Sequence, residues 1–186
     1  MESTSESLLE RVRQPQDANS WSRFIELYTP VIYGWARRSG FQEADACDLV
    51  QDVFAILVKK LGDFRYDPNH SFRAWLKTIV LNKVRERFRK NGQAQLPPGQ
   101  DFAESVLANE FGDSEFRREV VARAIQIMQQ DFQPTTWKAC WAVVVEGRPA
   151  EEVAQELGIR VGSVYAARFR VLARLRQELA GMLDFE

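Results

Sequence analysis

Apolar residues recur at intervals of three and four along most of this 186-residue chain, which is the period of an α-helix and not the alternation of a β-strand. The clearest stripe lies between residues 43 and 62. Its members are Ala46, Leu49, Val50, Val53, Phe54, Leu57 and Leu61. The β-branched run at residues 143–145 also lies in a segment with helical spacing. We therefore expect an all-α fold.

Glycine, proline and acidic residues divide the chain into three blocks. Residues 20–91 and 115–183 keep the helical period, whereas residues 92–114 contain a Pro-Pro-Gly sequence and several acidic side chains. Such a composition is typical of a linker. We expect two small helical domains, 20–91 and 115–183, joined by an acidic flexible linker at 92–114.

The C-terminal block contains the pattern of a helix-turn-helix. A short helical segment ends at Gly158, a turn follows, and a second helix begins near Ser163. Ala154 is small where two helices must cross closely, and Gly158 permits a left-handed turn residue. Ile159 and Val164 are placed to fill the core between the two helices.

Positive charge is concentrated in two segments, although the chain as a whole has a net charge of -1. Residues 72–90 carry seven Lys and Arg against one acid, Glu86, and no acid lies between Leu157 and Gln177. Clustered Lys and Arg side chains favour nucleic-acid binding, because neutralising phosphates releases condensed counterions. A solvated helix face is the alternative interpretation of either segment alone.

Several function classes are excluded by composition. Two cysteines and one histidine cannot provide a disulfide framework or a common zinc site, so we expect no metal and no cofactor. The N-terminus lacks the pattern of a signal peptide, and no apolar run approaches the roughly 20 residues that span a bilayer. We therefore expect a cytoplasmic protein that is not an enzyme and does not contact a membrane.

Two ordered motifs carry a family resemblance. The sequence DLVQDVF at residues 48–54 is followed by SFRAWL at residues 71–76 and then by Ile79 and Asn82. This pattern resembles region 2 of bacterial RNA polymerase sigma factors of the extracytoplasmic-function (ECF) group, and residues 147–179 resemble region 4. The resemblance implies a protein that binds core RNA polymerase and directs it to promoter DNA for opening and transcription initiation. It also implies an anti-sigma factor as a candidate partner.

The resemblance assigns polymerase binding to the helix at residues 48–54. The matched residues are Asp48, Leu49, Gln51, Asp52 and Phe54. The helical period adds that Leu49 and Phe54 face inward, whereas Asp48, Gln51 and Asp52 are available to a polar partner.

The next loop and basic helix match the family's contacts with the −10 element. We expect the aromatic rings of the loop to stack on an unpaired base, Asn82 to pair with a base edge, and the cations to hold phosphates. The residues are Phe64, Tyr66, Ser71, Arg73, Lys77, Asn82, Arg85 and Arg89.

The second helix of the helix-turn-helix matches the part of region 4 that binds the −35 element. Many relatives begin this helix with Thr-Val-Lys-Ser-Arg, whereas this chain has SVYAA at residues 163–167. Because the usual basic residues are missing, we expect an unusual −35 sequence. The candidate contacts are Arg160, Ser163, Tyr165, Arg168, Phe169 and Arg170.

Three other functions compete with the sigma factor. A stand-alone helix-turn-helix regulator would bind a duplex operator but would leave residues 48–54 without a role. A relative that binds only an anti-sigma factor would show no salt-dependent DNA binding. A helical enzyme has no support beyond scattered carboxylates.

Overall fold

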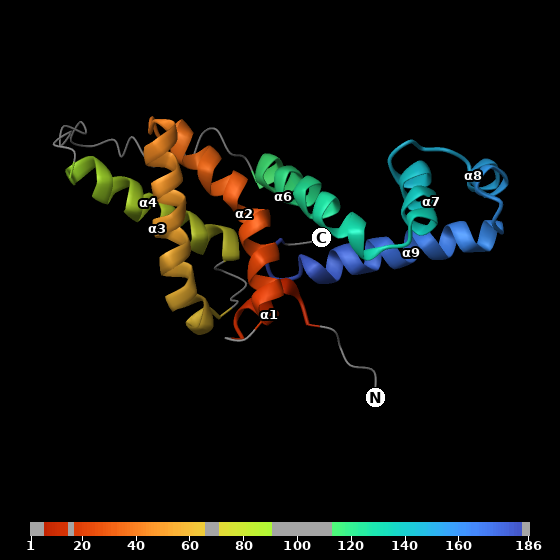
Figure 1. The fold of residues 1–186 in the computed structure, drawn as a ribbon, viewed down its shortest axis with the longest axis horizontal. Helices are drawn as coiled ribbons and strands as arrows, with labels where there is room; N and C mark the ends of the chain where they lie inside the picture. The colour runs from red at the N-terminus through yellow and green to blue at the C-terminus, as the bar shows by residue number, and fades with distance from the viewer. Residues whose placement is uncertain (1–5, 15–16, 66–70, 91–112, 184–186) are drawn as a thin grey trace.

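The computed structural model describes residues 6–14, 17–65, 71–90 and 113–183. Within these ranges the chain forms helices and no β-strand, which confirms the all-α prediction. The helices are α1 (Leu8–Val12), α2 (Ala18–Arg38), α3 (Glu43–Lys60), α4 (Phe72–Lys90), α6 (Asp113–Met128), α7 (Pro134–Val144), α8 (Ala150–Leu157) and α9 (Val161–Glu178). Two 3-10 turns, Leu61–Asp63 and Gln129–Asp131, follow α3 and α6. Figure 1 shows α1 to α4 and α6 at one end, α7 and α8 at the other, and α9 running between the two ends.

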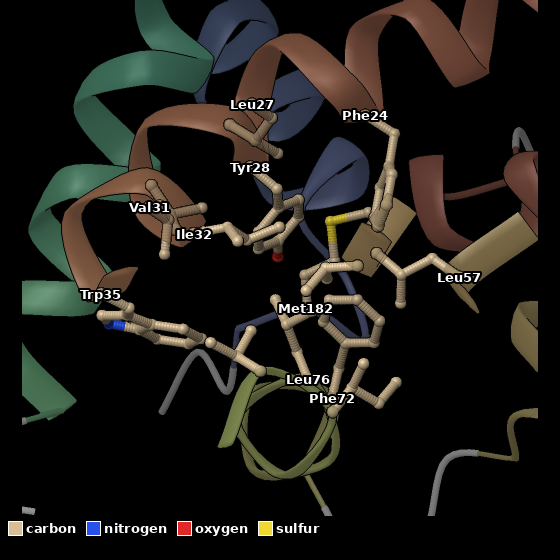
Figure 2. Close-up of a cluster of buried hydrophobic side chains, with 14 of the residues drawn as sticks. Phe24, Leu27, Tyr28, Val31, Ile32, Trp35, Leu57, Phe72, Leu76 and Met182 are labelled. Carbon is tan, nitrogen blue, oxygen red and sulfur yellow. The ribbon is translucent and has the colours of Figure 1, made fainter. Parts of the chain in front are cut away.

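The larger core is rich in aromatic side chains. Phe24, Tyr28 and Trp35 project from α2 and Phe72 from α4, and each is at most 1% exposed. The rings of Tyr28 and Phe72 meet edge to face, with centroids 5.5 Å apart, an arrangement that aromatic pairs prefer. Figure 2 shows Met182, from the far end of the chain, inserted among these rings.

The smaller core holds the helix-turn-helix together with alanine and valine. α9 packs against α7 and α8 through Val164 and Ala167, which are at most 4% exposed. Gly158 ends α8 with a φ of 64°, the left-handed conformation expected from the sequence. Ile159 packs against this core and Ala154 is buried in it, so the predicted helix-turn-helix packing is confirmed.

The two cores do not coincide with the expected ranges 20–91 and 115–183. Phe116, Val120 and Ala124 of α6 belong to the larger core and pack toward α2. Leu179, Met182 and Leu183 belong to it as well. The physical reason is that α6 and the chain's last turns each present an apolar face, which is removed from water by the aromatic side chains of the larger core. The segment 91–112, which contains most of the expected linker, lies outside the described residues.

The larger core also begins earlier than residue 20. Ser7 and Glu10 form a capping box, in which the Glu10 amide donates to Ser7 Oγ at 3.3 Å and the Ser7 amide donates to Glu10 Oε2 at 2.8 Å. This short helix buries Leu8, Leu9 and Val12.

Candidate nucleic-acid and partner interfaces

One face of α3 presents acidic and polar groups to solvent. The Asp48 side chain is 64% exposed and Gln51 is exposed. Leu49 is fully buried, and the Phe54 ring packs edge to face on Phe24 with centroids 6.3 Å apart. The helical period thus separates a polar outer face from an apolar inner face, as the sequence predicted for these residues.

Asp52 differs from the expectation, because it already has a partner. Arg87 of α4 donates from Nη2 to Asp52 Oδ2 at 2.9 Å, and its Nη1 lies 4.0 Å from Asp48 Oδ2. Arg87 Nη1 also donates to the main-chain oxygen of Asp45 at 3.4 Å. α4 lies close enough to α3 for Arg87 to contact it. Asp52 therefore links the two helices, and a polymerase would have to share it with Arg87.

Only part of the loop before α4 lies in the described residues, and its aromatic side chain Phe64 belongs to the core. Phe64 is 7% exposed, and its ring lies 5.5 Å from Phe72 and 4.8 Å from Trp75 between centroids. Stacking of Phe64 on a base conflicts with this placement, since the ring is buried against two aromatic side chains of the protein. Tyr66 lies outside the described residues. Ser71 caps α4 by accepting a hydrogen bond from the Ala74 amide at 3.3 Å.

The basic residues of α4 have unequal surroundings. Arg73 lies over the Phe116 ring of α6, 5.1 Å from its centroid, and burial lowers the pKa of its guanidinium. Lys77 and Arg85 are half-buried, whereas Asn82 and Arg89 are exposed. The described part of the predicted −10 surface therefore reaches solvent mainly through Asn82 and Arg89.

The N-terminal half of α9 is open to solvent. Val164, Ala167 and Val171 face the core, at spacings of three and four. The predicted −35 residues lie on the other faces and are all exposed: Arg160, Ser163, Tyr165, Arg168, Phe169 and Arg170. This is the arrangement that lets the second helix of a helix-turn-helix enter a major groove.

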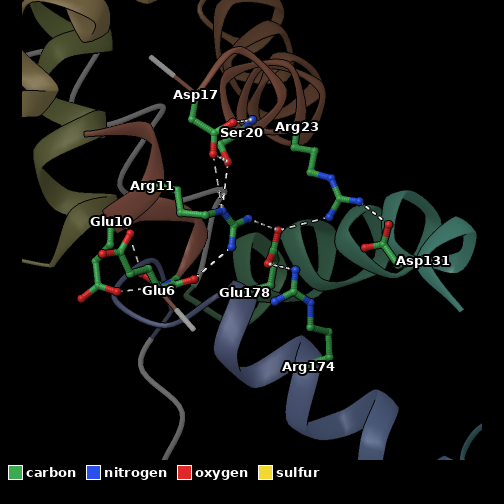
Figure 3. Close-up of polar contacts among 10 residues, drawn as sticks. Glu6, Glu10, Arg11, Asp17, Ser20, Arg23, Asp131, Arg174 and Glu178 are labelled. Carbon is green, nitrogen blue, oxygen red and sulfur yellow. Dashed lines mark hydrogen bonds and ion pairs between the residues drawn. The ribbon is translucent and has the colours of Figure 1, made fainter. Parts of the chain in front are cut away.

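A buried carboxylate, which the sequence analysis missed, ties α9 to the start of the chain. The Glu178 side chain is 4% exposed and lies 2.8 Å from Arg11, 3.4 Å from Arg23 and 3.2 Å from Arg174 (Figure 3). Arg23 also pairs with Asp131 after α6. The signal in the sequence was weak: Glu178 is the first acid after a long basic stretch, with no neighbouring motif.

Comparisons with known proteins identify the family of this chain. The family model described as Sigma-70 region 2 matches residues 24–94. The RNA polymerase sigma factor CnrH of Cupriavidus metallidurans is 33% identical over 158 residues, which cover 80% of this chain and 78% of that protein. The chain belongs to the ECF group of RNA polymerase sigma factors. CarQ of Myxococcus xanthus, another RNA polymerase sigma factor, is 29% identical over 181 residues, covering 96% of this sigma factor and 98% of CarQ.

The name of a third relative includes the ECF group. The ECF RNA polymerase sigma factor SigE of Mycolicibacterium smegmatis is 24% identical over 162 residues, covering 87% of this chain and 62% of the relative. This sigma factor therefore acts in transcription initiation, and the comparisons favour that function over a stand-alone regulator. Sigma factors are regulatory proteins, and a non-catalytic role fits the family. Across the described segments, no helix has the length and apolar character to cross a membrane.

Proposed function

We propose that this sigma factor uses three surfaces to bring core RNA polymerase to a promoter. The polar face of α3 contacts the polymerase through Asp48 and Gln51, with Asp52 beside them in its pair with Arg87, while Leu49 and Phe54 hold that face in place from the core. α4 contacts the −10 element through Asn82 and Arg89, with Lys77 and Arg85 beside them. The N-terminal half of α9 contacts the −35 element.

The observation that carries the proposal is the coexistence of two surfaces of opposite charge. α9 presents exposed arginines, and α3 presents Asp48 with most of its side chain in solvent. A regulator that binds only DNA has no use for the acidic surface, which repels phosphates. A bridging protein needs both, because complementary charge steers each partner to its own face.

The proposed working units are residues 20–91, the connection 92–114 and residues 115–183. The packing of α6 on α2 means that the unit at 115–183 shares its first helix with the larger core. We propose that an anti-sigma factor is a further partner and that the protein works in the cytoplasm, where its polymerase is. The role requires no cofactor and no catalytic residue.

Transcription in vitro tests the function. Purified core polymerase from the native organism is incubated with fragmented genomic DNA, with and without the protein. We expect discrete start sites that need the protein, with related sequences upstream of them. Absence of both new transcripts and polymerase binding would contradict the proposal.

The polymerase contact is tested by reversing one charge. Asp48→Lys is the sharper variant, because Asp52→Lys would remove the 2.9 Å pair with Arg87, whereas Asp48 is mostly exposed and lies 4.0 Å from Arg87. We expect weaker binding to core polymerase with an unchanged helical circular dichroism spectrum. Glu43→Lys, an exposed acid at the start of the same helix, is the matched control and should bind normally. Equal affinities for Asp48→Lys and the unaltered protein would remove α3 from the interface.

A further inference from the structure

The outermost face of α9 is apolar, although the helix is basic. Phe169 is 75% exposed and Tyr165 is 52% exposed. Among the large hydrophobic side chains that the structure describes, none is more exposed than Phe169. Two aromatic rings one helical turn apart are unfavourable in water, so their burial against a partner would lower the free energy. Exposed apolar patches of this kind mark interaction surfaces.

The same face contains small residues that leave room for a partner. Val164, Ala167 and Val171 point into the core, so the helical period places Gly162, Ala166 and Phe169 on the opposite side. A Cβ atom added to Gly162 would meet no atom within 4 Å. No other part of the described protein covers α9 at that point.

The charges beside this face identify its partner as a polyanion. Arg160, Arg168 and Arg170 are exposed around the aromatic residues, and no acid occurs between Leu157 and Gln177. An apolar protein partner would leave these arginines without counter-charges. The phosphates on both edges of a DNA groove supply them, while the aromatic rings enter between.

The chemistry of the face then limits what it can recognise. In the major groove, guanine, cytosine and adenine are distinguished by hydrogen-bond donors and acceptors, whereas thymine alone adds a C5-methyl group. Tyr165, Ala166 and Phe169 offer apolar surface, and the Tyr165 hydroxyl is the only polar atom on these side chains. Building on the −35 role proposed above, we propose that Tyr165 and Phe169 specify the −35 element by packing on the methyl groups of thymines.

Replacing thymine by deoxyuridine tests the inference without altering the protein, because it removes only the methyl group. Promoter duplexes recovered by the transcription experiment are resynthesised with deoxyuridine at single −35 positions on either strand, and holoenzyme affinity is measured. Where a thymine packs on Tyr165 or Phe169, its replacement by deoxyuridine should lower the holoenzyme affinity about fourfold, which is the effect of one buried methyl group. Deoxyuridine at the spacer thymines is the control and should have no effect.

Variants assign each methyl group to a side chain. In the Phe169→Ala holoenzyme, deoxyuridine at the position that packs on Phe169 should no longer lower affinity. Tyr165→Ala should likewise abolish the effect at the position that packs on Tyr165. Tyr165→Phe should retain that effect because the ring remains. Arg168→Ala should weaken thymine and deoxyuridine duplexes equally.

Two outcomes would overturn the inference and they differ in scope. Methyl recognition alone is overturned if binding depends on the −35 sequence but no deoxyuridine substitution lowers the affinity. It is also overturned if the −35 element contains no thymine on either strand. Binding that ignores the −35 sequence altogether overturns the proposed role of α9 as well.

Discussion

α4 and α9 are both basic helices, but their cations differ in what surrounds them. On α4, Arg87 pairs with Asp52, Arg73 lies over Phe116, and Lys83 and Lys90 both pair with Glu86. On the N-terminal half of α9, Arg168 and Arg170 are exposed, as is Arg160 at the cap of the helix. A similar density of positive charge in the sequence therefore produces two different surfaces.

The difference comes from the neighbours of each helix and from Glu86, an acid within α4 itself. α4 lies beside α3, which supplies acidic side chains, and near α6, which supplies an aromatic ring. The first half of α9 is covered on one side only, by the small apolar residues of α7 and α8. The lesson is that charge available to DNA is decided by packing partners, because a cation already paired gains less from a phosphate. The predictions below test this comparison.

The largest expected effect contrasts two phenylalanines. Phe116→Ala removes a ring that stacks on Trp35 at 5.8 Å and covers Arg73, so we expect the free energy of unfolding to fall by about 3–5 kcal/mol. Phe169→Ala, on the open face of α9, should change it by less than about 0.5 kcal/mol. Urea denaturation measures both. Similar losses for the two variants would mean that α9 is covered in solution.

The next effect concerns the buried end of α9. Glu178→Ala leaves Arg11, Arg23 and Arg174 without their shared carboxylate, and we expect a loss of about 3 kcal/mol in unfolding free energy. Glu146→Ala, an exposed acid 3.9 Å from Arg148, is the control and should be close to neutral. If both variants unfold at the same urea concentration, Glu178 does not anchor α9.

Salt dependence compares the two helices directly. Arg168→Ala should reduce the slope of log affinity against log salt concentration by about 1, because one phosphate contact is lost. Lys83→Ala on α4 should leave the slope unchanged, since Lys83 is engaged with Glu86 at 2.8 Å. Holoenzyme binding to a promoter duplex at several salt concentrations gives both slopes. A reduced slope for Lys83→Ala would show that Lys83 leaves Glu86 and contacts a DNA phosphate in the complex.

The smallest effect is a titration on α4. Hydrogen bonds from Lys83 and Lys90 lower the pKa of Glu86 from 4.5 to about 2. The pairs therefore add to stability above pH 4.5, and their small contribution disappears as the pH falls from about 4.5 to about 2. Carboxyl carbon NMR should show the low pKa, and Lys83→Ala with Lys90→Ala should return it toward 4.5. An ordinary pKa in the unaltered protein would contradict the pairing.

Local chemistry made much of the fold predictable. The apolar stripe of α3, the left-handed Gly158 and the buried Val164 follow from helical periodicity and from the steric freedom of glycine, and all appear in the structure. The start of the larger core could also have been predicted, because Ser7 and Glu10 have the spacing of a capping box and flank Leu8 and Leu9.

Contacts between distant segments could not be predicted in the same way. Periodicity shows that Phe116 and Met182 lie on apolar faces, but it does not say which core receives them. For the same reason, Phe64 looked like a base-stacking ring and Asp52 like an unpaired acid, while the structure buries one against Trp75 and pairs the other with Arg87. A single sequence carries no record of such pairings.

The insertion of Met182 and Leu183 into the first core has a consequence for synthesis. A chain grows from its N-terminus at about 5–20 residues per second, so the ribosome reaches these residues several seconds after it has made α4. During that interval the aromatic side chains of α2 and α4 lack one wall of their packing. A nascent chain that stops short of Leu179 keeps that wall open, which exposes its unfinished core to chaperones and proteases.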